Sequence, residues 1–310
     1  MKRIMTICLL ALFASSVMFV GCKREKQVRT FGFTCFYLGN PFFTILEKTI
    51  REEVEKNGDR LITVDPDRDR ERQVSQIEEL ISQKIDALFL NPVDLEAIRP
   101  ALVSLNKANI PVINFDSEVK DIDLVAAYVG SDNKNAGYIC GVDMVKRFPN
   151  GGPIAILDSP ARISTRNRIN GFKEAIEGKG FTIVFLRDAQ GNVSLARNYT
   201  EEMLKSNPEV VALIGSNDLV ALAAYATCQS AGRTDILIYG VDGSPAAKAE
   251  IAKRGQFAGT GAQSPINIAK TSVEVAYKIL NKQHYEKNVP ITTFMINQDN
   301  IDDYDINSWQ

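Results

Sequence analysis

Seven apolar runs in this chain each end on a short polar side chain. The runs span residues 61–65, 87–91, 111–116, 153–158, 211–217, 236–242 and 257–263, and they close on Asp65, Asn91, Asp116, Asp158, Asn217, Asp242 and Gln263. Carboxylate and amide groups are strong hydrogen-bonding partners for a polar ligand. Paired carboxylates also hydrolyse glycosides, but none of these acids stands in a motif that singles it out as a catalyst.

Other catalytic and metal-binding patterns are weak. His284 is the only histidine and lies in the polar stretch Lys282-Gln283-His284-Tyr285, where we expect it to be solvated. Without a second histidine or a close cysteine pair there is no metal-ligand spacing. Gly259-Thr260-Gly261 lacks the flanking pattern of a phosphate loop. We therefore expect no enzyme, no cofactor and no metal, with a hydrolase acting on sugars as the alternative from the enzyme class.

The polar residues must be positioned by the elements around them. A segment with a helical pattern follows the first strand-like stretch, 30–37, and helices are predicted over 43–57, 71–83, 95–108, 135–147, 164–177, 194–206, 219–231 and 267–281. In the first helix, Leu46, Ile50 and Val54 form an i, i+4, i+8 stripe. Alternation of strand and helix predicts an α/β fold with parallel sheets. The carboxyl ends of parallel strands share one edge, where ligands bind.

The length and net charge of the chain limit the number of domains and the kinds of ligand. The chain has 310 residues and a formal net charge of −2. Without residues 1–21 it keeps 34 basic against 38 acidic residues, a balance of −4, so it lacks the basic excess that binding a phosphate backbone requires. This size favours two domains. No Pro-Gly-Ser linker separates them, so crossing strands must join them, and Ser131-Asp132 and Gln263-Ser264 are the candidate crossing points.

The first residues predict export. Lys2 and Arg3 precede an apolar stretch at 4–20, too short for a comfortable membrane span, which ends in Phe19-Val20-Gly21-Cys22. This resembles a bacterial lipoprotein signal: residues 1–21 would be removed, Cys22 lipidated, and residues 22–29 would form a tether. The location implied is the periplasm or the outer face of the cytoplasmic membrane. The alternative is an ordinary cleaved signal with Cys22 incidental.

The remaining cysteines are widely spaced. Cys35, Cys140 and Cys228 lie in apolar segments, where a thiol usually acts as a small buried hydrophobe. Because an exported protein meets an oxidising environment, the sequence also allows one disulfide among them.

Six short motifs, in register along the chain, resemble one known family. They are Gly39-Asn40-Pro41-Phe42-Phe43, Pro111-Val112-Ile113-Asn114-Phe115-Asp116, Arg166-Asn167-Arg168-Ile169-Asn170-Gly171-Phe172, Ser216-Asn217-Asp218, Tyr239-Gly240-Val241-Asp242-Gly243 and Ala262-Gln263. From about residue 30 to 281 the chain resembles the ribose-binding branch of the type 1 periplasmic sugar-binding proteins. The resemblance implies two Rossmann-like lobes with parallel sheets joined by three crossovers. The lobes would comprise 30–131 plus 264–291 and 132–263 plus 292–310.

The resemblance also implies the ligand and its contacts. A monosaccharide would be held in the cleft between the lobes and delivered to an ABC permease by a monomer. The family's contacts fall on Asn40, Phe42, Phe43, Asp116, Arg166, Asn217, Asp242 and Gln263. Carboxylates, amides and arginine suit hydroxyl groups that both donate and accept hydrogen bonds. The phenylalanine rings suit the C–H face of a sugar.

Local structure offers a second interpretation for most of these residues. Asn40 and Asn217 precede predicted helices and could be N-caps. One of Phe42 and Phe43 could belong to the core, Asp242-Gly243 is also a turn signature, and Arg166 could be a solvated charge. Asp116 closes a buried strand and has no such local explanation.

Two departures from the ribose-binding pattern bear on the substrate. Ser117 replaces an arginine directly after the strand-end aspartate, and Gly191 or Asn192 stands where that pattern has an aromatic residue. Tyr37, Phe115 and Arg162 are the candidates to compensate. Trp309, the only tryptophan, lies in the tail, and we do not expect it at the site. The pocket therefore favours a hexose, a ketose, a polyol or another small polar solute over ribose.

The mechanism implied is closure of two lobes around a ligand that contacts both. A cytoplasmic sugar-responsive repressor shares this core, but it would carry a helix-turn-helix headpiece of roughly 50–60 residues where the export signal lies here. A ligand-sensing module for a chemoreceptor or sensor kinase remains the open alternative to transport.

Overall fold

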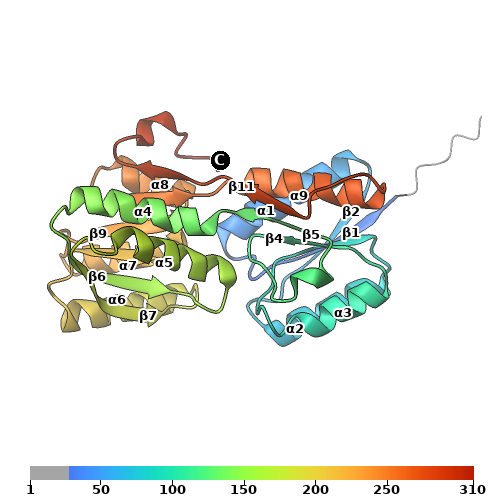
Figure 1. Ribbon diagram of the computed structural model, residues 1–310, viewed down its shortest axis with the longest axis horizontal. Helices are drawn as coiled ribbons and strands as arrows, with labels where there is room; N and C mark the ends of the chain where they lie inside the picture. The colour runs from blue at the N-terminus through green and yellow to red at the C-terminus, as the bar shows by residue number, and fades with distance from the viewer. Residues whose placement is uncertain (1–27) are drawn as a thin grey trace, which may run out of the picture.

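The computed structural model describes residues 28–310, so the predicted signal and Cys22 lie outside the described residues. Figure 1 shows two lobes side by side, each a sheet flanked by helices, and the end of the chain lies at their junction. None of the helices within residues 28–310 combines the length and apolar character needed to cross a bilayer.

The first lobe is built on a six-stranded parallel sheet, here called sheet A. Its strand order is β11-β5-β4-β3-β1-β2. The strands are β1 (Thr30–Thr34), β2 (Arg60–Val64), β3 (Ala87–Leu90), β4 (Val112–Phe115), β5 (Ala127–Ser131) and β11 (Asn288–Ile291). Helices α1 (Pro41–Lys56) and α9 (Pro265–Leu280) pack on one face, and α2 (Arg70–Ser82) and α3 (Arg99–Lys107) pack on the other, with a short 3-10 turn, η1 (Ile122–Leu124).

The second lobe repeats this arrangement around sheet B, whose order is β12-β10-β9-β8-β6-β7. The strands are β6 (Gly152–Asp158), β7 (Phe181–Asp188), β8 (Ala212–Gly215), β9 (Leu237–Asp242), β10 (Phe257–Ala262) and the antiparallel β12 (Phe294–Asn297). Helices α4 (Asn133–Arg147) and α5 (Ile163–Ile176) cover one face, and α6 (Val193–Ser206), α7 (Asp218–Ser230) and α8 (Pro245–Ala252) cover the other; η2 (Ile301–Asp303) follows β12.

The chain passes between the two sheets three times. It leaves sheet A after β5, returns after β10 and leaves again between β11 and β12. The predicted fold class, two lobes with mostly parallel sheets joined by crossovers, is confirmed. Cys35, Cys140 and Cys228 are buried and free, with apolar surroundings, so no disulfide links these three residues.

Two glycines let α4 and α5 approach each other closely. A Cβ atom at Gly137 would lie 1.7 Å from the carbonyl oxygen of Arg168, and one at Gly171 would lie 1.9 Å from that of Lys134. Any side chain there would push the helices apart, because real Cβ contacts are never so short. This close packing places the start of α4 beside the middle of α5.

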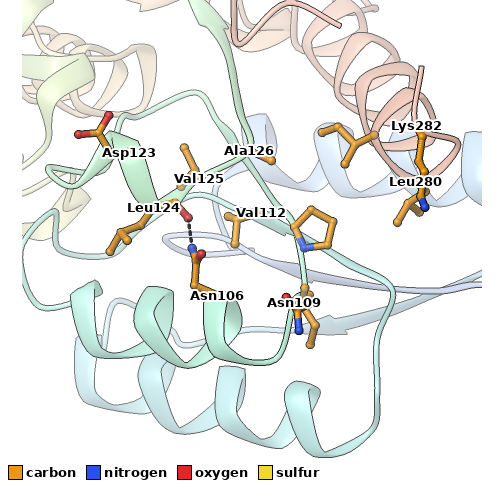
Figure 2. Close-up of a pocket in the computed structure, with 12 residues that line it drawn as sticks. Asn106, Asn109, Val112, Asp123, Leu124, Val125, Ala126, Leu280 and Lys282 are labelled. Carbon is orange, nitrogen blue, oxygen red and sulfur yellow. Dashed lines mark hydrogen bonds between the residues drawn. The ribbon is translucent and has the colours of Figure 1, made fainter. Parts of the chain in front are cut away.

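A hollow of about 450 Å³ lies away from the strand ends that carry the polar residues. Figure 2 shows its lining, in which the Asn106 side chain donates a hydrogen bond to the carbonyl of Leu124 at 2.8 Å. Pro111 and Ala126, which precede β4 and β5, also line it. It therefore lies at the amino ends of these strands, on the edge of sheet A opposite to the expected site.

Candidate functional site

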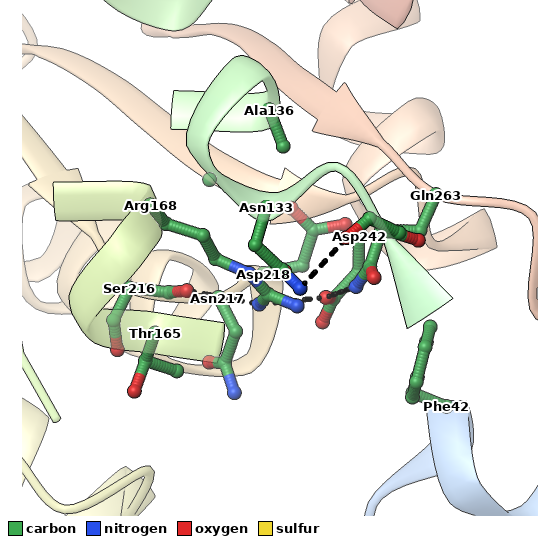
Figure 3. A network of polar contacts seen from close by, with 12 residues as sticks. Phe42, Asn133, Ala136, Thr165, Arg168, Ser216, Asn217, Asp218, Asp242 and Gln263 are labelled. Atoms are coloured by element: carbon green, nitrogen blue, oxygen red, sulfur yellow. Dashed lines mark hydrogen bonds and ion pairs between the residues drawn. The ribbon is translucent and has the colours of Figure 1, made fainter. Parts of the chain in front are cut away.

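The carboxyl ends of both sheets meet at one buried ionic group. Arg168 of α5 places its Nη1 3.1 Å from Oδ1 of Asp242, at the end of β9 (Figure 3). The same guanidinium lies 3.9 Å from Oδ1 of Asp116, which follows β4 in the other lobe. All three side chains are almost fully buried. Strand ends from both lobes therefore face a shared interior.

Arg168 is held in place by contacts from its own lobe. Its Nε donates to Oδ1 of Asn133 at 2.8 Å, and its Nη1 also donates to the carbonyl of Ser216 at 3.1 Å. The first contact depends on the close approach of α4 and α5. One planar group is thus fixed from three directions before any ligand arrives.

Arg166 is not part of this group, and its predicted role needs correction. Its side chain is exposed on α5. Two residues along an α-helix correspond to a rotation of about 200°, so Arg166 and Arg168 point to opposite sides of α5. The arginine that faces the cleft is Arg168.

One carboxylate oxygen of Asp116 accepts no hydrogen bond in the described residues. Its Oδ2 accepts from Nδ2 of Asn91 at 2.9 Å, whereas its Oδ1 has no hydrogen bond within the described part of the chain. Burial raises the pKa of Asp116, and the nearby Arg168 and Arg162 guanidiniums and the Asn91 hydrogen bond oppose the rise. A buried acceptor in this state is costly unless a ligand donor satisfies it.

Asp242 and Gln263 form the corresponding pair in the second lobe. Nε2 of Gln263 donates to Oδ1 of Asp242 at 2.8 Å, and Oε1 of Gln263 is buried without a partner among residues 28–310. Burial raises the pKa of Asp242 to about 7, although Arg168 opposes this; the neighbouring Asp218 carboxylate adds to the rise. Both carboxylate oxygens of Asp218 already accept hydrogen bonds, one from Ser244 N and one from Thr260 Oγ1, so Asp218 supports the backbone that follows β9.

Aromatic rings line the first lobe's side. Phe42 and Phe43 begin α1 and meet edge to face, with ring centroids 5.5 Å apart. Figure 3 shows Phe42 across from Asp242 and Gln263. Asn40 caps α1 by accepting from Phe42 N at 3.0 Å, and Asn217 caps α7 by accepting from Val220 N at 2.9 Å. Each cap uses Oδ1 alone, so the Nδ2 group of each amide is not consumed by capping.

Arg162 lies beside Gly191, one of the two departures from the ribose-binding pattern. It is 7% exposed, its guanidinium stacks 4.5 Å above the ring of Phe36 in the other lobe, and a Cβ added to Gly191 would lie 3.7 Å from its Nη2. We find no hydrogen bond from this guanidinium to residues 28–310. Burial lowers the pKa of Arg162, and the Asp116 carboxylate counteracts this. Phe36 and Arg162 thus fill the space beside Gly191.

The other two candidates to compensate lie elsewhere. Phe115 is fully buried and stacks on Phe33 inside sheet A. Tyr37 lies under the guanidinium of Arg68 at 3.6 Å. Ser117 instead joins the lobes, since its Oγ accepts from Ser164 N at 3.4 Å. The Ser164 hydroxyl, like Asp116 Oδ1 and Gln263 Oε1, is buried and has no hydrogen-bond partner in the described residues.

The structure therefore brings together most of the residues expected at the site. Asp116, Asp242 and Gln263 share one network, and Asn217 and Phe42 lie beside it; Asn40 and Phe43 flank Phe42 at the start of α1. Sequence reasoning missed Arg168, Asn133 and Ser164 as members. Asn91 was recognised only as the polar residue that ends a strand. That position was the one feature of the sequence that could have indicated its place at the site.

This arrangement offers several buried hydrogen-bonding groups to a ligand. Three buried acids, Asp116, Asp218 and Asp242, lie near two buried guanidiniums, Arg162 and Arg168, so the interior has no surplus of basic groups. No group of His, Cys, Asp and Glu suited to a metal ion occurs in residues 28–310. The buried donors and acceptors that lack a partner could form hydrogen bonds with a neutral ligand that carries several hydroxyl groups.

Known proteins share this architecture. A family model described as periplasmic binding protein domain matches residues 31–284. The ribose import binding protein of Bacillus subtilis is 33% identical over 266 residues, covering 86% of each chain. An ABC transporter solute binding protein from Mycobacterium smegmatis with bound glycerol is similar with a TM-score of 0.85 at 27% identity, covering 89% of this chain and 96% of that chain. One from Bacillus halodurans with bound myo-inositol gives 0.83 at 28% identity, with the same coverage.

Proposed function

The chain belongs to the periplasmic binding protein domain family, and from this premise we propose that it captures a monosaccharide or related polyol between its lobes and delivers it to an ABC permease. The observation that carries the proposal is that three buried oxygens contributed by the proposed site, Asp116 Oδ1, Gln263 Oε1 and Ser164 Oγ, have no hydrogen-bond partner in the described residues. They come from both lobes, and Asp116 and Gln263 belong to the Arg168 network. A ligand whose hydroxyls donate to them favours the closed form.

The buried charges argue against an anionic ligand. The interior around Arg168 already holds three buried carboxyl groups, Asp116, Asp218 and Asp242, against two buried guanidiniums, so an anion would add negative charge without a matching cation. Ribose, glycerol and myo-inositol, the ligands named for the relatives above, are all small neutral compounds with several hydroxyl groups. We propose the same chemical class here, with Arg162 supplying the donor that Ser117 lacks.

The proposed ligand contacts combine both lobes. They are Asn40, Phe42, Phe43, Asn91, Asp116, Arg162, Arg168, Asn217, Asp242 and Gln263.

We further propose that one lobe comprises residues 30–131 plus 264–291 and the other residues 132–263 plus 292–310. The protein works in the periplasm as a monomer, and Cys22 is lipidated after removal of residues 1–21. Cys22 follows Gly21 at the end of an apolar stretch, as in a lipoprotein signal.

A binding panel tests the function. Thermal shift and titration calorimetry with D-ribose, D-allose, L-arabinose, myo-inositol and glycerol should identify at least one ligand, because a ligand at 100 times its Kd stabilises the fold by about 2.7 kcal/mol. Asp116→Asn should weaken that binding about 10- to 100-fold, the range of one charged hydrogen bond.

Asp65→Asn is the matched control. Asp65 follows β2, the edge strand of sheet A, and its Oδ1 accepts from the backbone N–H groups of Leu38 and Asp67. This variant should bind like the wild type. If nothing in the panel binds, the proposed function is wrong; if a sugar binds equally well to the Asp116→Asn variant, the site assignment is wrong.

A further inference from the structure

One buried lysine holds the last residues of the chain on the second lobe. Lys248 of α8 is fully buried, and its Nζ donates to the carbonyls of Asp305 and Ser308, both at 2.5 Å. In the amide orientation that satisfies its neighbours, Gln310 accepts from the same Nζ and donates to the carbonyl of Gly243 at 3.1 Å. Residues 305–310, the C-terminal segment, are thus fixed beside Asp242 and Gly243.

The C-terminal segment presents Trp309 to the opposite lobe. The Trp309 ring meets Phe42 edge to face, with centroids 5.9 Å apart and planes at 72°. Trp309 also packs against the apolar cluster of sheet A. Figure 1 agrees, since the end of the chain lies at the junction of the lobes. The expectation that Trp309 stays away from the site is therefore wrong.

Phe42 is consequently fixed by two rings. The ring of Phe43, also in α1, meets it at an interplanar angle of 83°. The ring of Trp309, from the other lobe, meets it at an interplanar angle of 72°. Edge-to-face pairs have a preferred geometry, so the two contacts together set the plane of the Phe42 ring. Stacking on the C–H face of a sugar depends on that plane.

We propose that Trp309 is a positioning residue for ligand binding, which orients Phe42 and does so only when the lobes are together. This inference rests on the proposed function. The C-terminal segment is anchored on the second lobe and Phe42 belongs to the first, so the Trp309–Phe42 contact adds to the stability of the closed form alone. A ligand that selects the closed form gains from it.

A double-mutant cycle tests the proposal. Trp309→Ala should weaken binding of the tightest sugar of the panel about 3- to 10-fold, the range expected for one aromatic pair. Trp309→Phe should restore most of the affinity. In a Phe42→Ala background Trp309→Ala should have little further effect, because the two residues act through one contact.

The control removes an aromatic pair within one lobe. Tyr304 stacks on Phe294 with centroids 5.8 Å apart, and both belong to the second lobe. Tyr304→Ala should lower the unfolding temperature without weakening sugar binding. Unchanged affinity of the Trp309→Ala variant, or full additivity with Phe42→Ala, would overturn the inference while the proposed function stands. No binding by the wild type would overturn the proposed function, and the role of Trp309 with it.

A second measurement needs no ligand. Because Trp309 is the only tryptophan, its fluorescence reports the C-terminal segment directly. Lys248→Met should free the segment and increase acrylamide quenching of Trp309 at least twofold in the sugar-free protein. Lys253→Met, which removes an exposed lysine from the end of the same helix, should leave quenching unchanged. Equal quenching in both variants would contradict the anchoring on which the inference depends.

Discussion

Two carboxylates at the centre of the cleft have backbone conformations that favour glycine. Asp116 has φ of +59° and Asp242 has φ of +149°. Such conformations cost on the order of 1–3 kcal/mol each and persist where the surroundings enforce them. Here the backbone N–H of Asp116 donates to the Val129 carbonyl, and the Asp242 carbonyl accepts from Gln263 N. The strain is the cost of turning both carboxylates out of their sheets toward the shared interior.

Three arginines of one segment should differ sharply in their effect on sugar binding. Arg162→Met and Arg168→Met each remove a buried donor of charged hydrogen bonds, so each should weaken binding about 10-fold or more. Arg166→Met changes an exposed side chain between them and should bind like the wild type. Titration calorimetry with the tightest sugar measures all three, and a loss confined to Arg166→Met would restore the original assignment.

The raised pKa of Asp242 predicts a pH dependence of stability. Its pKa of about 7 lies above its ordinary value of 3.8, so the sugar-free folded protein binds a proton that the unfolded chain releases. The associated stabilisation is complete below pH 3.8 and is lost as the pH rises through 7. Relative to Asp242→Asn, the wild type should therefore lose on the order of a few kcal/mol across this window.

Urea unfolding of both proteins between pH 4.5 and 8 measures this difference. Groups that do not interact with Asp242 cancel in the comparison, so the change belongs to Asp242 and to its neighbours Asp218 and Arg168. Two curves that stay parallel across the window would show that Asp242 does not titrate abnormally.

At this scale the sequence predicted positions better than side-chain directions. Strand-end polar residues such as Asp116, Asp242 and Gln263 could be found because each closes an apolar run. Arg168 could not be distinguished from Arg166, since the choice depends on the rotation of α5 relative to the cleft. Trp309 was missed because its contact with Phe42 joins residues at opposite ends of the sequence.

At the scale of elements, the contact between α4 and α5 positions the central guanidinium. Gly171→Ala would place a Cβ atom against the Lys134 carbonyl and force the helices apart. Although alanine favours helix formation, we expect the free energy of unfolding to fall by about 1–3 kcal/mol, as for other overpacked sites. Sugar affinity should also fall, because Arg168 lies one turn before Gly171.

Gly255→Ala is the control for this prediction. A Cβ atom there meets open space, so the unfolding free energy should stay within about 0.5 kcal/mol of the wild type. Denaturant unfolding measures both variants. Equal stability of the two would show that α4 and α5 can separate at little cost.

The elements with strong patterns were predicted, and those without were not. All seven apolar runs contain strands, and six of these strands are mostly buried, as expected for strands covered on both faces, whereas β2 lies at an edge of sheet A. Strand β7 was not named, since it lies at an edge and leaves Ile183 and Leu186 exposed. Helix α8 was missed as well, because its eight residues, Pro245–Ala252, are too few to show a clear helical period.

At the scale of the whole molecule, contacts between the lobes define the closed form. They include the Arg168–Asp116 ion pair, the Ser164–Ser117 hydrogen bond and the stacking of Arg162 on Phe36. All three involve residues at or next to the proposed ligand contacts, and all three depend on a polar or charged side chain. The closed form should therefore depend on the ligand.

Small-angle X-ray scattering should detect this dependence. We expect the radius of gyration of the wild type to fall when the tightest sugar is added, because the ligand shifts the population from open to closed. The Asp116→Asn variant at the same sugar concentration should change far less. A radius that is identical with and without sugar would mean that closure does not accompany binding.

The three passages between the sheets constrain how this protein can be recombined with its relatives. Each half of the binding surface is assembled from separate stretches of the polypeptide, so a single breakpoint would always transplant parts of both halves. A chimera that exchanges one complete half needs simultaneous junctions near residues 132, 264 and 292. Changes of specificity by substitution of individual side chains are therefore far more accessible than changes by exchange of segments.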